Sequence, residues 1–255
     1  MTNEEIMRIA MEQSAKDINC TAQDFLSTKN VIVRSSIGEE ARRYYKEPVA
    51  FNLVSYGNNI VASVRDEFRA LVDEYISRFS LYRCFETPNL NWLIERLSST
   101  GQKICFMAEY SLPDVEKLCP LPCDYKVRML ESRDFEKLYL PEWQNALCSV
   151  RKELDVLGAG AYSDGKLIAL AGASADCKKM WQIGVDVLPE FRRKGIASSL
   201  VSTLASEILN KGIVPFYCSA WSNLRSVRTA LKSGFVPAWV ELTAKPAEIV
   251  DKMNV

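Results

Sequence analysis

The sequence predicts an α/β (α+β) protein in two parts, with a smaller amino-terminal α/β domain followed by a domain in which a sheet is flanked by helices. Strand-like apolar runs are interspersed with runs of helical periodicity along the chain. Hydrophobic residues make up 48% and charged residues 25% of the 255 residues, which is typical of a protein with a sizeable core. A Pro-dense, weakly periodic stretch predicts a boundary between Asp114 and Asp124, which gives domains 1–118 and 119–255.

The amino-terminal part predicts a small α/β unit. The runs on either side of Asn58-Asn59 indicate a β-hairpin, and residues 65–79 have the spacing of an amphipathic helix. A second helix is expected from Thr87, and residues 103–110 predict a buried strand. This part is expected to be either an unrelated α/β cap or a degenerate half of the fold that follows it.

The carboxy-terminal part predicts the order β-α-(α)-β-β-β-α-β-α-β. Residues 125–130 alternate as a strand does, and Ser132 fits the cap of a following helix. Asp164-Gly165 indicates a hairpin between two apolar strands, because this dipeptide accepts positive φ. The remaining predicted elements are a strand at 180–187, a helix at 196–209, a strand at 214–220, a helix at 223–232 and a strand near 236–244.

Charge and hydropathy exclude several classes of function. Thirty-two basic residues balance thirty-two acidic ones, so no global field attracts nucleic acid or an anionic membrane. No apolar run approaches the length of a membrane span, and the first residues, MTNEEIMRIAMEQ, are too acidic for a signal peptide. We therefore expect a cytoplasmic protein without a nucleic-acid or membrane partner.

The residue types also limit the chemistry. The chain has no histidine, which excludes Ser-His and Cys-His nucleophilic catalysis and an imidazole general base. The eight cysteines lie mostly in apolar stretches and are expected to be buried reduced thiols. Cys119 and Cys123 have neither a second pair nor a histidine to complete a zinc site, so no metal is expected.

The most informative stretch is a basic glycine loop between a predicted strand and a predicted helix. Residues 192–194 are all basic, and Gly195 lets the backbone approach a ligand closely. The first amides of a helix have no intrahelical partner and lie at the positive end of its dipole, so the loop favours a bound phosphate. A P-loop motif and a GxGxxG turn are both absent, since Gly158 and Gly160 have no third glycine.

These residues resemble a known family. The spacing Arg192-x-x-Gly195-x-Ala197 is similar to the acyl-coenzyme A pyrophosphate loop of the GNAT acetyltransferase superfamily. Further matches follow where GNAT enzymes commonly carry an Asn, a small residue and a Gly-Phe pair, namely Asn223, Ser226, Gly234 and Phe235. The resemblance covers roughly residues 125–245 and implies a mixed, mostly antiparallel sheet flanked by helices.

The resemblance implies an N-acetyltransferase in which a primary amine of a small molecule or peptide directly attacks acetyl-CoA. It also implies that the sheet splits between strands 180–187 and 214–220, where main-chain groups of the first strand meet the pantetheine arm. The residues expected to bind acetyl-CoA are Val185, Val187, Arg192, Arg193, Lys194, Gly195, Ile196, Ala197, Ser198, Asn223 and Ser226.

Two positions depart from the family pattern. Many GNAT enzymes carry a Tyr seven residues after the Asn that protonates the leaving thiolate, and this chain has Ala230 there. Many also carry a Glu near the start of the central strand that acts as a base through water, and Trp181 takes its place. The remaining candidates for acid or base are Asp186, Glu142, Tyr217, Glu109 and Cys218, with a structural carboxylate as the alternative for Asp186 and a packing thiol for Cys218.

The acceptor side is less determined by the sequence. Trp143, Trp221 and Glu109 are the expected pocket residues, and core packing is the alternative for the two tryptophans. A homodimer is possible. Two other functions stay open: an acyl-CoA-binding sensor or scaffold without catalysis, and an aminoacyl-tRNA-dependent transferase that forms peptide bonds.

Overall fold

The computed structural model describes residues 1–45 and 47–253, apart from the side chain of Phe106. The chain forms two compact units. The first unit comprises Met1–Ala10 and Tyr110–Pro237, and the second comprises Met11–Glu109 and Ala238–Val255.

The first unit is built on a mixed, mostly antiparallel sheet, as the predicted fold class requires. Its strand order is β4-β9-β8-β7-β6-β5. The pairs β5–β6, β6–β7 and β7–β8 are antiparallel, and β8–β9 is parallel. The strands are β4 (Gln102–Pro113, in this unit from Tyr110 onward), β5 (Lys126–Glu131), β6 (Asp155–Ser163), β7 (Lys166–Ser174), β8 (Met180–Val187) and β9 (Val214–Ser219).

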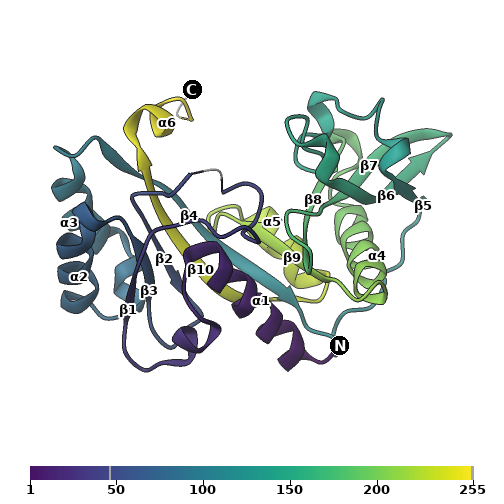
Figure 1. The fold of residues 1–255 in the computed structure, drawn as a ribbon. Helices are drawn as coiled ribbons and strands as arrows, with labels where there is room; N and C mark the ends of the chain where they lie inside the picture. The colour runs from purple at the N-terminus through teal and green to yellow at the C-terminus, as the bar shows by residue number, and fades with distance from the viewer. Residues whose placement is uncertain (46, 254–255) are drawn as a thin grey trace. The chain divides into compact units, whose positions relative to one another are not determined.

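Two helices of the first unit follow β8 and β9, as predicted. Helix α4 (Ile196–Asn210) packs against β6, β7 and β8, and α5 (Leu224–Lys232) contacts α4 and β9 (Figure 1). Leu200 and Leu204 on α4 are fully buried against small strand residues such as Ala159 and Ala171. Short side chains on the strands let the long apolar side chains of the helix reach the sheet.

The hairpin at Asp164-Gly165 is confirmed. Asp164 has φ 49° and Gly165 has φ 80°, and Ser163 pairs with Lys166 across the turn. Positive φ at both central residues is the geometry that matches the twist of the flanking strands, and Asp and Gly tolerate it.

The predicted helix after Ser132 is wrong. Residues Ser132–Asp134 form only a 3₁₀ turn, and the segment up to β6 holds two more such turns, Pro141–Trp143 and Lys152–Leu154. The carboxylate of Asp134 accepts a hydrogen bond of 2.8 Å from the amide of Glu131, which closes the turn on itself. This bond is part of a capping box, but the next backbone bond, from the amide of Leu138 to the carbonyl of Phe135 at 2.8 Å, again spans three residues, so 3₁₀-type turns continue in place of an α-helix.

The second unit has its own sheet and core. Its strand order is β1-β3-β2-β10-β4, in which β1 and β3 are parallel and β2 is antiparallel to both β3 and β10. The elements are β1 (Val31–Arg34), β2 (Phe51–Ser55), β3 (Val61–Val64), β10 (Phe235–Pro246, in this unit from Ala238), α2 (Arg69–Arg78), α3 (Thr87–Leu97) and α6 (Ala247–Asp251). The predicted β2–β3 hairpin, both helices and the β4 strand are confirmed, but among the described side chains of residues 103–110 only Ala108 and Tyr110 are buried, so the expectation of a buried strand was wrong for most of this stretch. Further 3₁₀ turns span Ala22–Leu26, Asp66–Phe68, Tyr82–Phe85 and, in the first unit, Pro189–Phe191.

Helix α1 (Asn3–Ile18) was not predicted. Its buried residues include Gln13, Ser14 and Asp17 beside Ala10 and Ala15. A helix that buries polar and small side chains has a weak apolar period, which is why the sequence pattern missed it.

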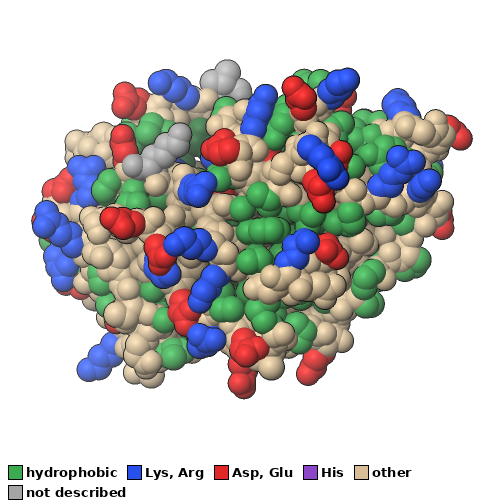
Figure 2. All heavy atoms as spheres, turned by 45° about the vertical axis from the view of Figure 1, so that its right-hand side comes forward, with side chains coloured by type: hydrophobic (Ala, Val, Ile, Leu, Met, Phe, Trp, Pro, Cys, Tyr) green, Lys and Arg blue, Asp and Glu red, His purple; other side chains and the backbone are tan. Residues whose placement is uncertain are grey.

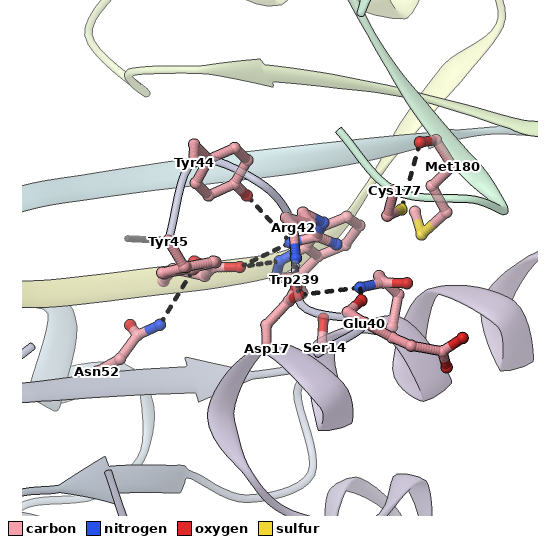
Figure 3. Close-up of polar contacts among 12 residues, drawn as sticks. Ser14, Asp17, Glu40, Arg42, Tyr44, Tyr45, Asn52, Cys177, Met180 and Trp239 are labelled. Carbon is pink, nitrogen blue, oxygen red and sulfur yellow. Dashed lines mark hydrogen bonds and ion pairs between the residues drawn. The ribbon is translucent and has the colours of Figure 1, made fainter. Parts of the chain in front are cut away.

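A buried charged cluster in the second unit explains these polar residues (Figure 3). The guanidinium of Arg42 is fully buried, 3.0 Å from the carboxylate of Asp17 and 3.7 Å from that of Glu241. It donates to the hydroxyl of Tyr44 at 3.2 Å, and Tyr45 donates to Glu241 at 3.0 Å. Hydrogen bonds on several sides compensate for removing these charges from water.

The residue ranges of the two compact units differ from the predicted domains, which meet at residue 118. The Pro-dense segment expected to be a linker is fixed to α4, because Ser199 donates to the carbonyl of Leu121 at 2.8 Å and the amide of Leu121 donates to Ser202 at 3.0 Å. The last strand, β10, leaves the first unit at Pro237. As independently folding domains, 1–118 and 119–255 stay a prediction.

Basic and acidic side chains are interspersed over the face of the molecule that Figure 2 shows.

All eight cysteines lie outside disulfides, as expected. The expectation that most of them are buried was wrong, because only Cys84 and Cys177 are buried and Cys119 is exposed. Among the described residues, no helix combines the length and the apolar character that crossing a membrane requires.

Candidate functional site

The loop between β8 and α4 presents a run of backbone amides that have no protein acceptor. Within the described residues, the N–H groups of residues 193–198 donate no hydrogen bond, and the amide of Ser199 is the next to do so, to the carbonyl of Gly195 at 3.1 Å. Gly195 occupies the N-cap of α4 and has no side chain with which to cap these amides. Six consecutive donors therefore lie at the positive end of a 15-residue helix.

The backbone of the loop has the geometry of an anion site. Arg193 and Gly195 have φ of 65° and 78°, so left-handed residues bend the chain at two points before the helix begins. Such bends turn successive amides toward one side. Apart from Gly195 and its two chain neighbours, the only atom of the described residues within 4 Å of a Cβ built on Gly195 is Lys232 Nζ, at 3.7 Å, so a basic side chain borders this side of the loop.

Two of the three basic side chains of the loop are held by the protein. Arg192 Nε donates to the carbonyl of Val187 at 3.0 Å, which fixes the loop to the end of β8. Lys194 Nζ donates to the hydroxyl of Tyr125 at 3.1 Å and lies 5.1 Å from the centre of the Phe191 ring. These contacts leave the two charges beside the amides while fixing where they lie.

The sheet splits next to this loop. The parallel ladder of β8 and β9 runs from Met180–Val214 to Ile183–Tyr217 and ends there, although β8 continues to Val187. On its other side β8 stays paired with β7 up to Ala169–Val187. The edge of β8 that faces β9 is therefore released from Gly184 onward, and its main-chain groups are positioned to bond an amide-rich chain.

Tyr217 lies where the ladder ends. Its side chain is 5% exposed, and its hydroxyl lies 2.9 Å from that of Ser226 on α5. Burial raises the pKa of Tyr217 above its usual value of 10, the hydrogen bond with Ser226 lowers it in part, and the charge of Asp186 raises it further. The phenol is therefore protonated at neutral pH and can donate a proton.

Asp186 is engaged in structure. Its carboxylate accepts hydrogen bonds from the amide of Asn145 at 2.8 Å, the side chain of Asn145 at 2.6 Å and the amide of Ala146 at 3.0 Å. The same turn lies directly on β7 and β8, since a Cβ at Gly172 would overlap the carbonyl of Ala146 and a Cβ at Gly184 would overlap that of Asn145. Asp186 thus holds this turn on the strands.

A family model described as GNAT acetyltransferase matches residues 88–238. The chain belongs to the GNAT acetyltransferase family. A comparison with curated proteins finds no match.

Three solved structures that are similar to this chain are distant from it in sequence. A GNAT-family acetyltransferase from Novosphingobium aromaticivorans is 21% identical over 56% of this chain and 66% of its own, with a TM-score of 0.44. A GCN5-related N-acetyltransferase-like protein from Streptococcus suis is 18% identical over 62% and 68%, with a TM-score of 0.46. An aminoglycoside N-acetyltransferase in complex with CoA is 22% identical over 48% and 93%, with a TM-score of 0.36.

The structure brings the predicted binding residues of the GNAT domain together. Val185 and Val187 lie on the released part of β8, and Gly195, Ile196 and Ala197 form the turn into α4. The side chain of Ser198 is buried, so its contribution to the loop is its amide. Asn223 and Ser226 lie at the start of α5, where Asn223 caps the helix by accepting from the amide of Ser226 at 3.3 Å.

The residues predicted for the acceptor side differ in burial and in the part of the fold to which they belong. Trp143 is buried in a core cluster with Phe135, Leu147 and Leu170, which makes it a packing residue and corrects the expectation of a pocket wall. Trp221 is 60% exposed just after β9. Glu142 is exposed on a 3₁₀ turn, and Glu109 lies on the part of β4 that belongs to the second unit.

Sequence analysis missed two residues of this site. Lys232 and Ser233 end α5, 37 and 38 positions after Gly195 in the sequence, and only the packing of α5 on α4 brings them to the loop. The signal was present in the row of basic residues at 225, 228 and 232, which has helical spacing and includes Lys232.

Proposed function

We propose that this GNAT protein is an N-acetyltransferase that transfers an acetyl group from acetyl-CoA to a primary amine of a small molecule or peptide. The run of six unbonded amides at residues 193–198 carries the proposal. A diphosphate offers acceptor oxygens in a small volume, and aligned amides at a helix start, together with Arg193 and Lys232, supply donors and positive charge there.

The unpaired edge of β8 indicates where the acyl group of acetyl-CoA would lie. A pantetheine arm carries amides that bond the main chain near Val185 and Val187, which directs the thioester into the split beyond Ile183 and Tyr217. In the reaction, the amine nitrogen bonds to the acetyl carbon, the carbon–sulfur bond breaks, and the amine loses a proton as the thiolate gains one. Positioning supplies a large part of such a rate.

Tyr217 is the best placed acid for the thiolate. It is protonated, it lies at the split, and Ser226 orients its hydroxyl at 2.9 Å. The family's usual acid position is occupied by Ala230, which is 3% exposed and has no ionisable group. Tyr217 reaches the same end of the sheet from β9 instead of from α5.

A screen for acetylated product tests the proposal. Because the chain has eight thiols outside disulfides, product amide and CoA are measured by chromatography and mass spectrometry, which avoids a thiol-reactive dye. The protein is mixed with acetyl-CoA and a panel of primary amines and peptides. We expect acetylated product with at least one acceptor class, and wild-type protein that binds CoA but acetylates none of them would contradict the transferase.

A second candidate is an acyl-CoA-binding protein without catalysis. The observation that favours it is the engagement of Asp186, whose oxygens accept three hydrogen bonds and leave it poorly placed as a base. The same screen separates the two candidates, since both predict CoA binding and only the transferase predicts product.

A further inference from the structure

Helix α5 carries three basic side chains on one side of its exposed face. Arg225, Arg228 and Lys232 are exposed, and at 100° per residue they lie within about 60° of one another around the helix axis. Within the part of the chain that the structure describes, none of the three forms an ion pair with Asp or Glu. We refer to these three residues as the α5 cationic row.

Ser233 fixes the end of the row beside the amide loop. Ser233 is 1% exposed, and its hydroxyl donates either to the carbonyl of Ser198 at 3.1 Å or to that of Thr229 at 2.8 Å. The first of these bonds ties the end of α5 to the first turn of α4. Lys232 Nζ consequently lies 3.7 Å from the position of a Cβ on Gly195.

The α5 cationic row adds positive charge beyond that which the loop and α4 already provide for a diphosphate. Six amides and the dipole of α4 already act at the diphosphate site, residues 192–194 of the same loop are basic, and Lys232 borders the site. From Lys232 the row continues along α5 through Arg228 to Arg225, a length of about 10 Å at 1.5 Å per residue. Three unpaired cations on one face repel one another, so the arrangement favours a further anion next to the diphosphate.

We propose that the α5 cationic row binds the ribose 3′-phosphate of CoA, so that the protein distinguishes CoA from 3′-dephospho-CoA. This inference rests on the proposed function. A phosphate monoester carries close to two negative charges at neutral pH and accepts hydrogen bonds from Lys and Arg in several directions. It is attached to the ribose that also bears the diphosphate, so it reaches α5 while the diphosphate occupies the amides.

Binding of two ligands that differ by this one phosphate tests the inference. Dissociation constants for CoA and 3′-dephospho-CoA are measured by calorimetry on the full chain at fixed ionic strength. We expect wild-type protein to bind CoA about tenfold more tightly than 3′-dephospho-CoA. Arg225 and Arg228 lie farther along the row than Lys232, which borders the diphosphate, so Arg225→Met and Arg228→Met should each weaken CoA about threefold to tenfold and change 3′-dephospho-CoA less, and the preference falls.

Lys211→Met provides the matched control. Lys211 is an exposed lysine at the far end of α4, about 24 Å from Gly195 along the helix, so its replacement should leave the preference unchanged. Equal wild-type affinity for the two ligands, or a preference that survives both α5 substitutions, would overturn the inference and leave the transferase standing. Wild-type protein that binds neither ligand would instead overturn the proposed function, and this inference with it.

Discussion

The hydroxyls of Tyr217 and Ser226 lie 2.9 Å apart, at the point where the β8–β9 ladder ends. Tyr217 lies on β9, and Ser226 is the second residue after the first residue of α5. The hydrogen bond therefore joins the strand and the helix next to the split in the sheet. It orients a buried phenol whose pKa is raised above 10, largely by burial.

Tyr217→Phe should therefore reduce the turnover number for acetyl transfer and leave CoA binding nearly unchanged. Loss of a general acid costs about 10²-fold to 10⁴-fold in rate. Ser226→Ala keeps the phenol and removes only its partner, so its loss should be smaller. Steady-state kinetics with the best acceptor, together with CoA affinity by calorimetry, measure both effects. A Tyr217→Phe enzyme with wild-type turnover would exclude Tyr217 as the acid.

The close packing of the Asn145 turn on β8 requires a glycine at position 184. Gly184→Ala places a methyl group on the carbonyl oxygen of Asn145, and backbone cannot move aside as a side chain can. We expect a loss of more than about 2 kcal/mol in the free energy of unfolding. Gly160→Ala on β6 is the control, because its Cβ meets the flexible end of Leu167 at 2.8 Å and should cost less than about 1 kcal/mol. Urea unfolding compares the two, and equal losses would contradict the assigned contact.

The buried charges of the second unit predict a strong dependence on Arg42. Arg42→Met leaves the carboxylates of Asp17 and Glu241 buried without their cation, which should cost about 3–5 kcal/mol. Lys16→Met removes a lysine from an exposed pair with Glu40 and should cost less than about 1 kcal/mol. Both changes replace a cation with a methionine of similar length. Similar unfolding midpoints for the two variants would show that the Arg42 cluster contributes little.

Asp155 predicts a pH dependence of stability. Burial raises its pKa from 3.8 to about 6, against the lowering effect of hydrogen bonds from the amide of Cys148 and from Tyr139. A raised folded-state pKa favours folding below pH 3.8, and this contribution is lost as pH rises through about 6. Asp155→Asn removes the titration.

The stability of Asp155→Asn relative to wild type should consequently rise by about 2–3 kcal/mol between pH 4 and pH 7 and then level off. Urea unfolding at several pH values measures the difference. A difference that stays constant over this range would contradict the raised pKa of Asp155.

Sequence patterns predicted the elements whose signals are local. The hairpin at Asp164-Gly165 and the turn into α4 at Gly195 both depend on residues that accept positive φ, and both were found. Helix α1 was missed because its buried face contains Gln13 and Asp17, which bond within the Arg42 cluster, and Ser14, whose hydroxyl lies 2.8 Å from that of Tyr56. The helix expected after Ser132 did not form because the backbone bonds there span three residues, as from Leu138 to Phe135.

In the candidate site too, the features that follow from a local sequence pattern were predicted and those that depend on tertiary packing were not. The loop amides follow from the order strand, glycine, helix, which is a local pattern. The position of Lys232 depends on how α5 packs on α4, and the engagement of Asp186 depends on a turn 41 residues earlier in the chain. The basic row at 225, 228 and 232 is visible in the sequence, but its neighbour in space is not, and the contact of Asp186 leaves no local pattern, so only the structure assigns these two contacts.

The amides before α4 are proposed to bind the diphosphate of CoA, and a matched pair of glycine variants at the two ends of this helix distinguishes that site from any other. Gly195 and Gly212 have φ of 78° and 76° and lie at opposite ends of α4, so replacement by Glu strains both backbones equally and adds the same charge. Thermal unfolding is followed with and without CoA. CoA should raise the melting temperature of wild type and of Gly212→Glu and leave that of Gly195→Glu unchanged. A shift that survives in Gly195→Glu would place the CoA phosphates elsewhere and contradict the account.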